Sequence, residues 1–454
     1  MSKETRALPV RATGLASVPV APGRLPVLGH ALSLWRHPLE FLRGLSSAGD
    51  LVRIDIGTLP VCCVTRADLV HDLLVTKARS FEKGRFFDRL RPLAGDGLAT
   101  ASAEVHRSHR GLVRPSFHHD RIADYTAIMS RRTAALTESW RPGQTVVLDE
   151  EFCSLVGAIM AEAMFSAPLG RQAELAVRRD GPVIFDNLLV RTLLPRFLDR
   201  VPVPANRRFN AASRRMRTVI DEVIRAYRAD GRDHGDLLSA LMLARDADTG
   251  RALDDLEIRD ELVTILIGGI EGTAATLAWI FHELGRLPEA ARRVREEARE
   301  VARSGLIRHQ DLGRLEYTGR VVDEALRLKG VPFLMRRAVE PVEIDGVRLP
   351  AGTEVGFSLH ALHRDPRLFP DPERFDPDRW LPERRHSRPR HAFMPFGAGS
   401  RKCVGDVFAR TEMITVAATV LARWDVRPVP GHSVREVTSA VIRPNRLPVT
   451  VEPA

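Results

Sequence analysis

Apolar residues recur along much of the chain at the three- and four-residue spacing of helices that bury one face. The longest run covers residues 254–287 and ends before Pro288. About 30 residues at ~1.5 Å each make a helix of ~45 Å, long enough to cross a whole domain. Other helical runs lie at 120–180, 206–247 and 288–301. These patterns predict several helices arranged around one long one.

Alternating apolar and polar positions predict a few strands between the helices. Residues 52–56 and 61–64 flank the turn Gly-Thr-Leu-Pro and read as a hairpin. Two short strands are expected within residues 342–357, and a second hairpin within residues 437–449.

Size and cysteine usage narrow the class of protein. The chain has 454 residues, 44% of them hydrophobic, which allows one large domain or two or three small ones with a sizeable core. Four cysteines without regular spacing argue against a disulfide framework and for a reducing compartment. We expect an irregular leader at 1–25 and a single domain at 26–454.

The chain is basic, with a formal net charge of +10 and a sequence pI of about 10.1. Such a charge suits nucleic acid, an acidic membrane or an acidic protein. Arginine is spread over the whole chain, and no basic block alternates with aromatics, so we expect an acidic protein partner or a general abundance of arginine, and no nucleic acid. No run approaches the ~18–20 apolar residues that span a bilayer, so no membrane anchor is expected.

One cysteine lies in the glycine-rich, basic segment 396–405, Phe-Gly-Ala-Gly-Ser-Arg-Lys-Cys-Val-Gly. Backbone N–H groups and nearby cations favour a thiolate there, and an apolar helix of roughly twenty residues follows. A thiolate serves as a nucleophile, a zinc ligand or an iron ligand. Zinc needs further ligands at short spacing, whereas one thiolate acting alone fits the axial ligand of haem. Cys62, Cys63 and Cys153 lie far upstream in apolar surroundings and are expected to pack.

The spacing Phe-x-x-Gly-x-Arg-x-Cys-x-Gly in this segment resembles the haem-binding loop of the cytochrome P-450 monooxygenases. The alternative is a buried structural cysteine beside a glycine turn. With further motifs in the family's order, the resemblance covers about residues 20–450. It implies a mainly α fold with a small β lobe, the triangular prism of that family, and haem b as cofactor. The short chain without a membrane helix points to a soluble, cytoplasmic, bacterial type. The implied iron ligand is Cys403, and the other implied haem contacts in the loop are Phe396, Gly397, Arg401 and Gly405.

The resemblance also implies cationic ligands for the haem propionates. His106 and Arg110 match the family's His-x-x-x-Arg, one helical turn apart, and Arg336 matches a propionate-binding arginine; Arg401 would join them. Propionates are carboxylates that need compact cationic donors. A solvated basic helix face is the alternative for the first two.

The middle of the long helix, residues 267–273, reads Ile-Gly-Gly-Ile-Glu-Gly-Thr. Glycine inside a helix costs ~1 kcal/mol against alanine, so three glycines need a reason. The stretch resembles the family's oxygen-activation motif, which implies Gly269 beside the cofactor under a widened helix and Glu271 as the catalytic acid. Gly272 stands where the family usually has a hydroxyl. Water, a substrate hydroxyl or a repositioned Thr273 is expected to take over.

Two further motifs match structural elements of the family. Glu324 and Arg327 match Glu-x-x-Arg on one helix face, and Arg374 in Pro-Glu-Arg-Phe would be their partner. Two cations sharing one carboxylate are expected to form a stiff buried element.

The implied substrate is hydrophobic. Segments 22–30, 79–84 and 204–209 are similar to actinobacterial terpene-tailoring members of the pentalenene oxygenase type, which implies hydroxylation of a cyclic terpene in secondary metabolism. A fatty acid or polyketide is the alternative, as is a peroxide-driven peroxygenase, although residues 268–274 lack the arginine that would hold a fatty-acid carboxylate. Electrons would come from a ferredoxin and its reductase, to a monomer. Expected pocket residues are Phe86, Phe87, Leu189, Leu266, Ile270, Phe333, Leu334 and Val441.

Overall fold

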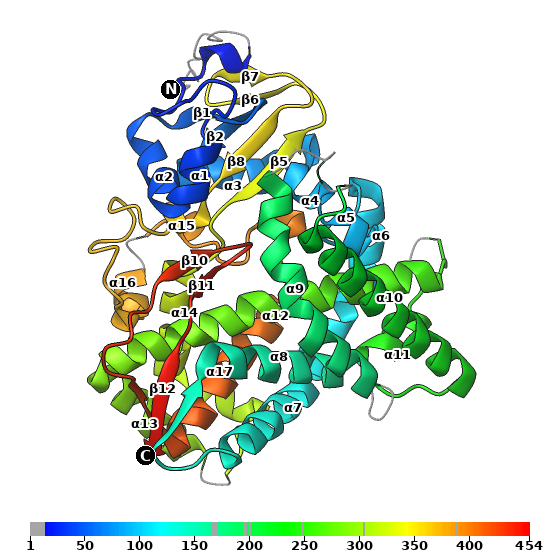
Figure 1. Cartoon of the computed structure of the whole chain (residues 1–454), viewed down its shortest axis with the longest axis vertical. Coiled ribbons are helices and arrows are strands. Elements are labelled where there is room, and N and C mark those ends of the chain that lie inside the picture. The colour runs from blue at the N-terminus through cyan, green and yellow to red at the C-terminus, as the bar shows by residue number, and fades with distance from the viewer. Residues whose placement is uncertain are drawn as a thin grey trace, which may run out of the picture. The chain divides into compact units, whose positions relative to one another are not determined.

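The computed structural model describes residues 14–165, 170–193, 198, 201–246, 249–302, 305–385 and 388–454. The chain forms two compact units. The smaller unit combines residues 1–89, 331–372 and 389–402, and the larger combines 90–330, 373–388 and 403–454. Each unit therefore joins segments far apart in the sequence (Figure 1). The predicted domain boundary at residue 25 stays a prediction.

The smaller unit is built on a five-stranded sheet with the order β1-β2-β8-β5-β3. Its first two strands form the predicted hairpin, with Ile56 opposite Leu59 across a two-residue turn in which Gly57 has φ +60°. This backbone region favours glycine. The strands are β1 (Leu51–Ile56), β2 (Leu59–Val64), β3 (Phe81–Lys83), β5 (Leu334–Ala338) and β8 (Glu354–Phe357), with β6 (Val342–Ile344) and β7 (Val347–Leu349) pairing separately.

Short helices accompany this sheet: α1 (Ala31–Arg36), α2 (Pro38–Gly44), α3 (Ala67–His71), α4 (Arg85–Asp88) and α15 (Leu359–Leu362). Part of the expected leader also packs here. The amide of Ala21 donates to Arg53 O at 2.9 Å, and Val18 and Ala21 are buried. After the expected leader, Val27 and Trp35 are exposed.

The larger unit is organised around α12 (Asp255–Arg286), the predicted long helix. Its N-cap is Asp254, whose carboxylate accepts from Glu257 N at 2.8 Å, while the Glu257 carboxylate accepts from Asp254 N at 3.0 Å. This capping box satisfies two N-terminal amides. Pro288 begins the next helix and prevents continuation. α12 packs against α8 (Leu148–Met164), α10 (Pro204–Asp230) and α17 (Asp406–Arg423). Among the described helices, α12 alone is long and apolar enough to cross a membrane, yet 61% of that stretch is buried in the core.

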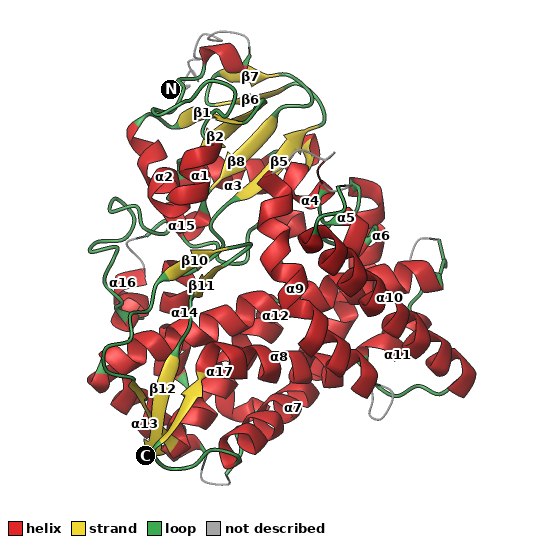
Figure 2. Cartoon of the chain, viewed as in Figure 1, coloured by secondary structure: helices red, strands yellow, loops and turns green. Residues whose placement is uncertain are grey.

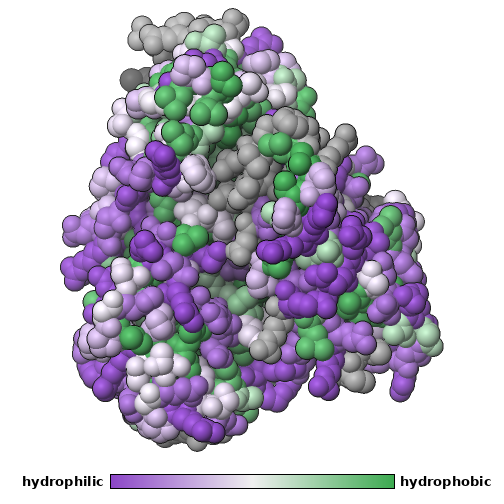
Figure 3. Space-filling view, in the orientation of Figure 1, coloured by the Kyte–Doolittle hydropathy of each residue, from purple (hydrophilic) through white to green (hydrophobic). Residues whose placement is uncertain are grey.

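Helices dominate this unit, as Figure 2 shows. The others are α5 (Arg91–Ala94), α6 (Ala103–Val113), α7 (His119–Glu138), α9 (Arg171–Leu193), α11 (Leu237–Leu243), α13 (Pro288–Val301), α14 (Glu316–Leu328) and α16 (Pro382–Arg385). A small sheet has the order β4-β12-β9, made of β4 (Gln144–Val147), β9 (Trp424–Pro428) and β12 (Pro448–Pro453). The predicted C-terminal hairpin is β10 (Glu436–Thr438) with β11 (Ile442–Pro444). Hydrophilic side chains predominate on the face of this unit in Figure 3, as expected where apolar faces turn inward.

Candidate functional site

Cys403 lies just before α17, in the larger unit, and its side chain is exposed. Arg110 of α6 interacts with it electrostatically. Burial lowers the pKa of Arg110, and the charge of a Cys403 thiolate acts in the opposite direction. A neighbouring cation and a helix N-terminus both favour the thiolate form. By contrast, burial raises the pKa of Cys62 to about 12, which agrees with a packing role for that residue.

The glycines before the cysteine are required by the backbone. Gly397 and Gly399 have φ values of +74° and +70°, a region that side chains disfavour. At Gly399 an added Cβ would also lie 2.0 Å from Leu74 O. Position 399 therefore needs glycine both for its φ angle and for lack of space. Position 397 needs glycine for its φ angle alone, since no heavy atom of the described residues lies within 4 Å of a Cβ added at Gly397.

α12 presents a bare backbone face at Gly268 and Gly272. A Cβ added at either glycine would meet no heavy atom of the described chain within 4 Å, the helix's own nearby backbone aside. The two positions are one helical turn apart, so they share a face. Gly269 differs, because its Cβ would come 2.9 Å from Met160 Cε of α8. The open face is thus formed by Gly268 and Gly272, and Gly269 lets α8 approach. The helix is α-helical throughout, so the expected widening is not observed.

The predicted acid, Glu271, is bonded from the C-terminal hairpin. Ser439 Oγ donates to Glu271 Oε1 at 2.7 Å, across 168 residues of sequence. Thr273 is buried, and Thr276 Oγ1 donates to Gly272 O at 2.8 Å. The sequence predicted a hairpin within residues 437–449, which includes Ser439, but it did not identify Ser439 as a partner of the acid, because no local signal links the two segments.

In the smaller unit, Arg336 and Arg401 form a pair of like charges. Burial, together with the charge of Arg401, lowers the pKa of Arg336 to about 10. Burial also lowers the pKa of Arg401, while Glu82 acts against that shift. Arg336 is buried and Arg401 is partly buried. Like charges disfavour each other, so a carboxylate of a ligand near both guanidinium groups would be favoured.

These donors fit a haem. A thiol with a neighbouring cation suits iron, an arginine suits a propionate, and a helix face without side chains leaves room for a flat ring. Within the larger unit, Cys403, Arg110, Gly268 and Gly272 have surroundings of this kind. Within the smaller unit, Arg336 has them.

The family described as "Cytochrome P450" matches residues 19–450. The chain belongs to the cytochrome P450 family. It is a haem-thiolate monooxygenase that uses O2, a hydrophobic substrate and electrons from redox partners, and its fold is mainly α with small sheets, as the sequence predicted.

Related proteins share most of the length of this cytochrome P450. It is 42% identical over 435 residues to "Cyclooctat-9-en-7-ol 5-monooxygenase" of Streptomyces melanosporofaciens, covering 95% of each chain. It is 38% identical over 430 residues to "Pentalenene oxygenase" of Streptomyces avermitilis, covering 94% of this chain and 95% of that one. The solved cytochrome P450DA heme domain aligns with a TM-score of 0.86 at 25% identity, covering 96% of this chain and 98% of that one.

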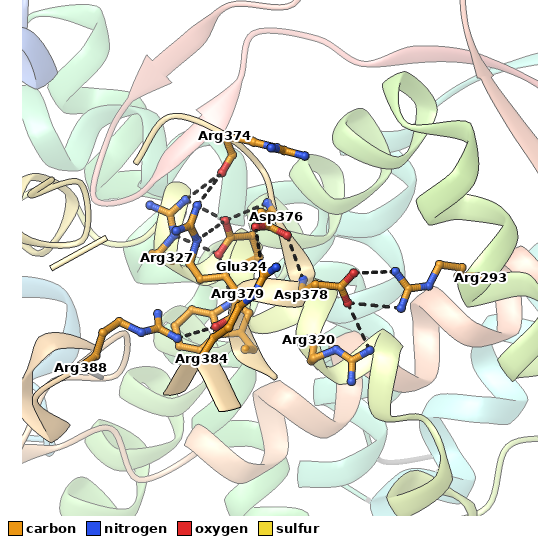
Figure 4. Close-up of polar contacts among 11 residues, drawn as sticks. Arg293, Arg320, Glu324, Arg327, Arg374, Asp376, Asp378, Arg379, Arg384 and Arg388 are labelled. Atoms are coloured by element: carbon orange, nitrogen blue, oxygen red, sulfur yellow. Dashed lines mark hydrogen bonds and ion pairs between the residues drawn. The ribbon is translucent and has the colours of Figure 1, made fainter. Parts of the chain in front are cut away.

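Glu324 of α14 is the centre of a buried network in the larger unit (Figure 4). Arg327 donates to its two oxygens at 2.9 Å and 2.8 Å. Asp376 N and Trp380 Nε1 each donate at 3.0 Å. Arg379 supplies a further cation, with Nε at 3.3 Å from Oε1. Five donors thus converge on one carboxylate, as a buried charge requires.

The prediction that the Arg374 side chain is a partner in this network is wrong. Arg374 is exposed, and in Figure 4 its guanidinium group points away from Glu324. Only its backbone enters the network, since Arg374 O accepts from Arg327 Nη2 at 3.1 Å. Arg379, five residues later, supplies the second cation, because the intervening 3₁₀ turn (Pro377–Trp380) carries its side chain back to α14.

A second buried network was missed by sequence reasoning. His109 Nδ1 lies 2.8 Å from Glu261 Oε1, and Leu98 N donates to Glu261 Oε2 at 3.1 Å. Asp260 accepts from Asp96 N at 3.0 Å. Two neighbouring carboxylates of α12 therefore bind the backbone amides of Asp96 and Leu98. The available signal was the adjacent pair of acids, Asp260 and Glu261, directly before the apolar part of α12.

The remaining predicted residues have these positions. His106 is buried in α6, and Leu266 and Ile270 are buried on α12 one turn apart. Phe86 and Phe87 are half-buried, and their rings pack edge-to-face with the ring centroids 5.2 Å apart. Their contact with substrate stays a prediction, as it does for Phe333, Leu334 and Val441, which are half-buried. Leu189 lies in α9, and its side chain is outside the described residues. Phe396 and Gly405 flank the cysteine, and Gly405 caps α17.

Proposed function

We propose that this cytochrome P450 hydroxylates an unactivated C–H bond of a cyclic terpene in bacterial secondary metabolism. The observation that carries the proposal is the similarity, at 42% and 38% identity over nearly the whole chain, to enzymes named for cyclooctat-9-en-7-ol and pentalenene. A fatty acid or a polyketide is the second candidate, because buried aliphatic residues such as Leu266 and Ile270 favour any apolar guest.

The proposed cofactor is haem b, held through iron by Cys403, and when bound it supplies the activation of O2. His106, Arg110, Arg336 and Arg401 are the proposed ligands of its propionates, since each side chain is a cation or a hydrogen-bond donor of the kind that carboxylates bind. Gly268 and Gly272 leave the space in which O2 and the reacting carbon meet.

Glu271 is the proposed proton carrier. Its carboxylate takes up a proton at Oε1 or Oε2 and passes it into the space beside Gly272, through ordered water, a substrate hydroxyl or Thr273. Replacing Thr273 by Ala and Gly272 by Thr separates these routes. If Thr273→Ala abolishes turnover while Gly272→Thr changes nothing, Thr273 carries the proton. If neither substitution matters, water or substrate does.

The proposed electron donor is a ferredoxin with its reductase, attracted to basic residues such as Lys402 beside the cysteine. We infer a monomeric enzyme in the cytoplasm. A peroxide-driven reaction is the alternative, and it predicts product from H2O2 alone at the rate seen with NADPH and ferredoxin.

The test begins with the spectrum of the dithionite-reduced protein under carbon monoxide, in which thiolate ligation gives a red-shifted Soret band. Cys403→Ser serves as the control that should lack this band. A panel of cyclic terpenes and fatty acids is then titrated for displacement of the water ligand, seen as a type I shift, and product mass is measured. A response to fatty acids alone refutes the terpene proposal.

A further inference from the structure

The tip of the C-terminal hairpin is held firmly against α12. β10 and β11 pair with Glu436 opposite Pro444 and Thr438 opposite Ile442. Trp279 Nε1 of α12 donates to Ile442 O at 2.8 Å. Lys329, at the end of α14, forms an ion pair with Glu436. These anchors on both strands leave Ser439 buried at the tip with little freedom to withdraw from α12.

The hydroxyl of Ser439 has two acceptors within reach for its one proton. Oγ lies 2.7 Å from Glu271 Oε1 and 3.1 Å from Val441 O, and Val441 N approaches the same oxygen at 3.4 Å. A serine hydroxyl rotates to suit its surroundings and also accepts hydrogen bonds. While Glu271 is ionised, donation to the carboxylate is the stronger choice. When Glu271 is protonated, the carboxyl O–H donates to Oγ, and the serine proton turns to Val441 O.

Other ionisable groups share this neighbourhood. Cys153 of α8 interacts electrostatically with Glu271. Burial raises the pKa of Cys153, Glu271 and Asp149 raise it further, and Arg443 of β11 lowers it. Glu271 is therefore partly buried, with charges of both signs nearby. The Ser439 hydroxyl is the group that can rotate in response to them.

We propose that Ser439 is a positioning residue that keeps Glu271 in one orientation through both of its protonation states. The proposal rests on the proton-carrier role proposed above and deepens it. A glutamate side chain has three rotatable bonds. A hydroxyl side chain at the next position could restrain it, but that position is Gly272. The restraint comes instead from the hairpin, 168 residues away in sequence.

The test compares Ser439→Ala and Ser439→Thr with Glu271→Gln in the haem-loaded protein. Thr438→Val, on the same hairpin, is the matched control. The infrared carboxyl band that disappears in Glu271→Gln is assigned to Glu271 and titrated with pH. Loss of a donor to the ionised form should move its midpoint upward by about one pH unit in Ser439→Ala, with the wild-type midpoint retained in Ser439→Thr and in Thr438→Val.

Product formed per NADPH, with the terpene substrate that the panel identifies, is the second measurement. We expect it to fall about tenfold in Ser439→Ala and to recover in Ser439→Thr. An unchanged midpoint and unchanged coupling in Ser439→Ala overturn the proposal, even if Glu271→Gln uncouples the enzyme. If Glu271→Gln itself has no effect on coupling, the proton-carrier role fails, and a shifted midpoint then shows a hydrogen bond without catalytic importance. Should Ser439→Ala not fold, Ser439→Cys keeps the volume with a weak donor and replaces it in both measurements.

Discussion

Replacing Arg374 or Arg379, two of the arginines in the segment 373–388, by Met should have very different effects on stability. Arg379 is buried and donates to Glu324, whereas Arg374 is exposed and contributes a backbone carbonyl that any residue retains. Arg379→Met removes a charge-assisted hydrogen bond, typically ~1.5–3 kcal/mol. Arg327→Met removes the main counter-charge of a fully buried carboxylate, at ~3–5 kcal/mol. Arg374→Met should remain within about 0.5 kcal/mol of the wild type.

These free energies translate into modest shifts of the melting temperature. At ~2.1 cal/mol/K of unfolding entropy per residue, a chain of 454 residues loses about 1 °C for each kcal/mol. We therefore expect decreases of about 3–5 °C for Arg327→Met, about 1.5–3 °C for Arg379→Met and less than about 1 °C for Arg374→Met. Circular dichroism of the haem-loaded protein measures the melting temperature, and the ratio of Soret to protein absorbance measures retained haem.

The double variant Glu324→Gln/Arg327→Met provides an internal check. The double variant has no buried carboxylate without its main counter-charge, and Arg379 is the one cation of the network that loses an acceptor. It should therefore be less destabilised than the sum of the single variants. The interpretation is refuted if Arg374→Met and Arg379→Met melt at the same reduced temperature, or if Arg327→Met melts like the wild type.

Three other outcomes are expected. Gly399→Ala combines a left-handed φ with a Cβ that would lie 2.0 Å from Leu74 O, so the yield of soluble, haem-containing protein should fall sharply. In Gly397→Ala only the left-handed φ opposes the new side chain. This variant should lose only ~1–2 kcal/mol of unfolding free energy, measured by denaturant titration. Burial would lower the pKa of His109, but the hydrogen bond and charge of Glu261 raise it above its ordinary value of 6.5. The stability that comes from the raised pKa of His109 is therefore fully present below about pH 6.5 and is lost as pH rises through that raised pKa. Hydrogen exchange at Leu98 should show this loss, and an identical pH dependence in His109→Gln would contradict it. Cys403→Ser should bind haem but lack the red-shifted band with carbon monoxide, and a persisting band would assign the iron ligand elsewhere.

Much of the architecture was predictable because it depends on local chemistry. Asp254 and Glu257 form a capping box within four positions, Pro288 prevents the long helix from continuing, and Gly57 permits the turn of the first hairpin. The cysteine loop could also be predicted from the sequence, since Gly397 and Gly399 have the positive φ angles that favour glycine. The family, the monooxygenase class and the haem-thiolate chemistry follow from such short-range patterns.

Contacts between distant segments were decided by the tertiary structure. Periodicity tells which face of α12 is apolar, yet only packing shows that Gly269 meets Met160 while Gly268 and Gly272 remain open. In the same way, a 3₁₀ turn gives Arg379 the place predicted for Arg374. The hydrogen bond from Ser439 to Glu271 joins residues 168 positions apart. A sequence specifies the preference of each segment for helix, turn or strand, but which side chains then meet depends on how whole elements pack, and that is settled by the free energy of the complete fold.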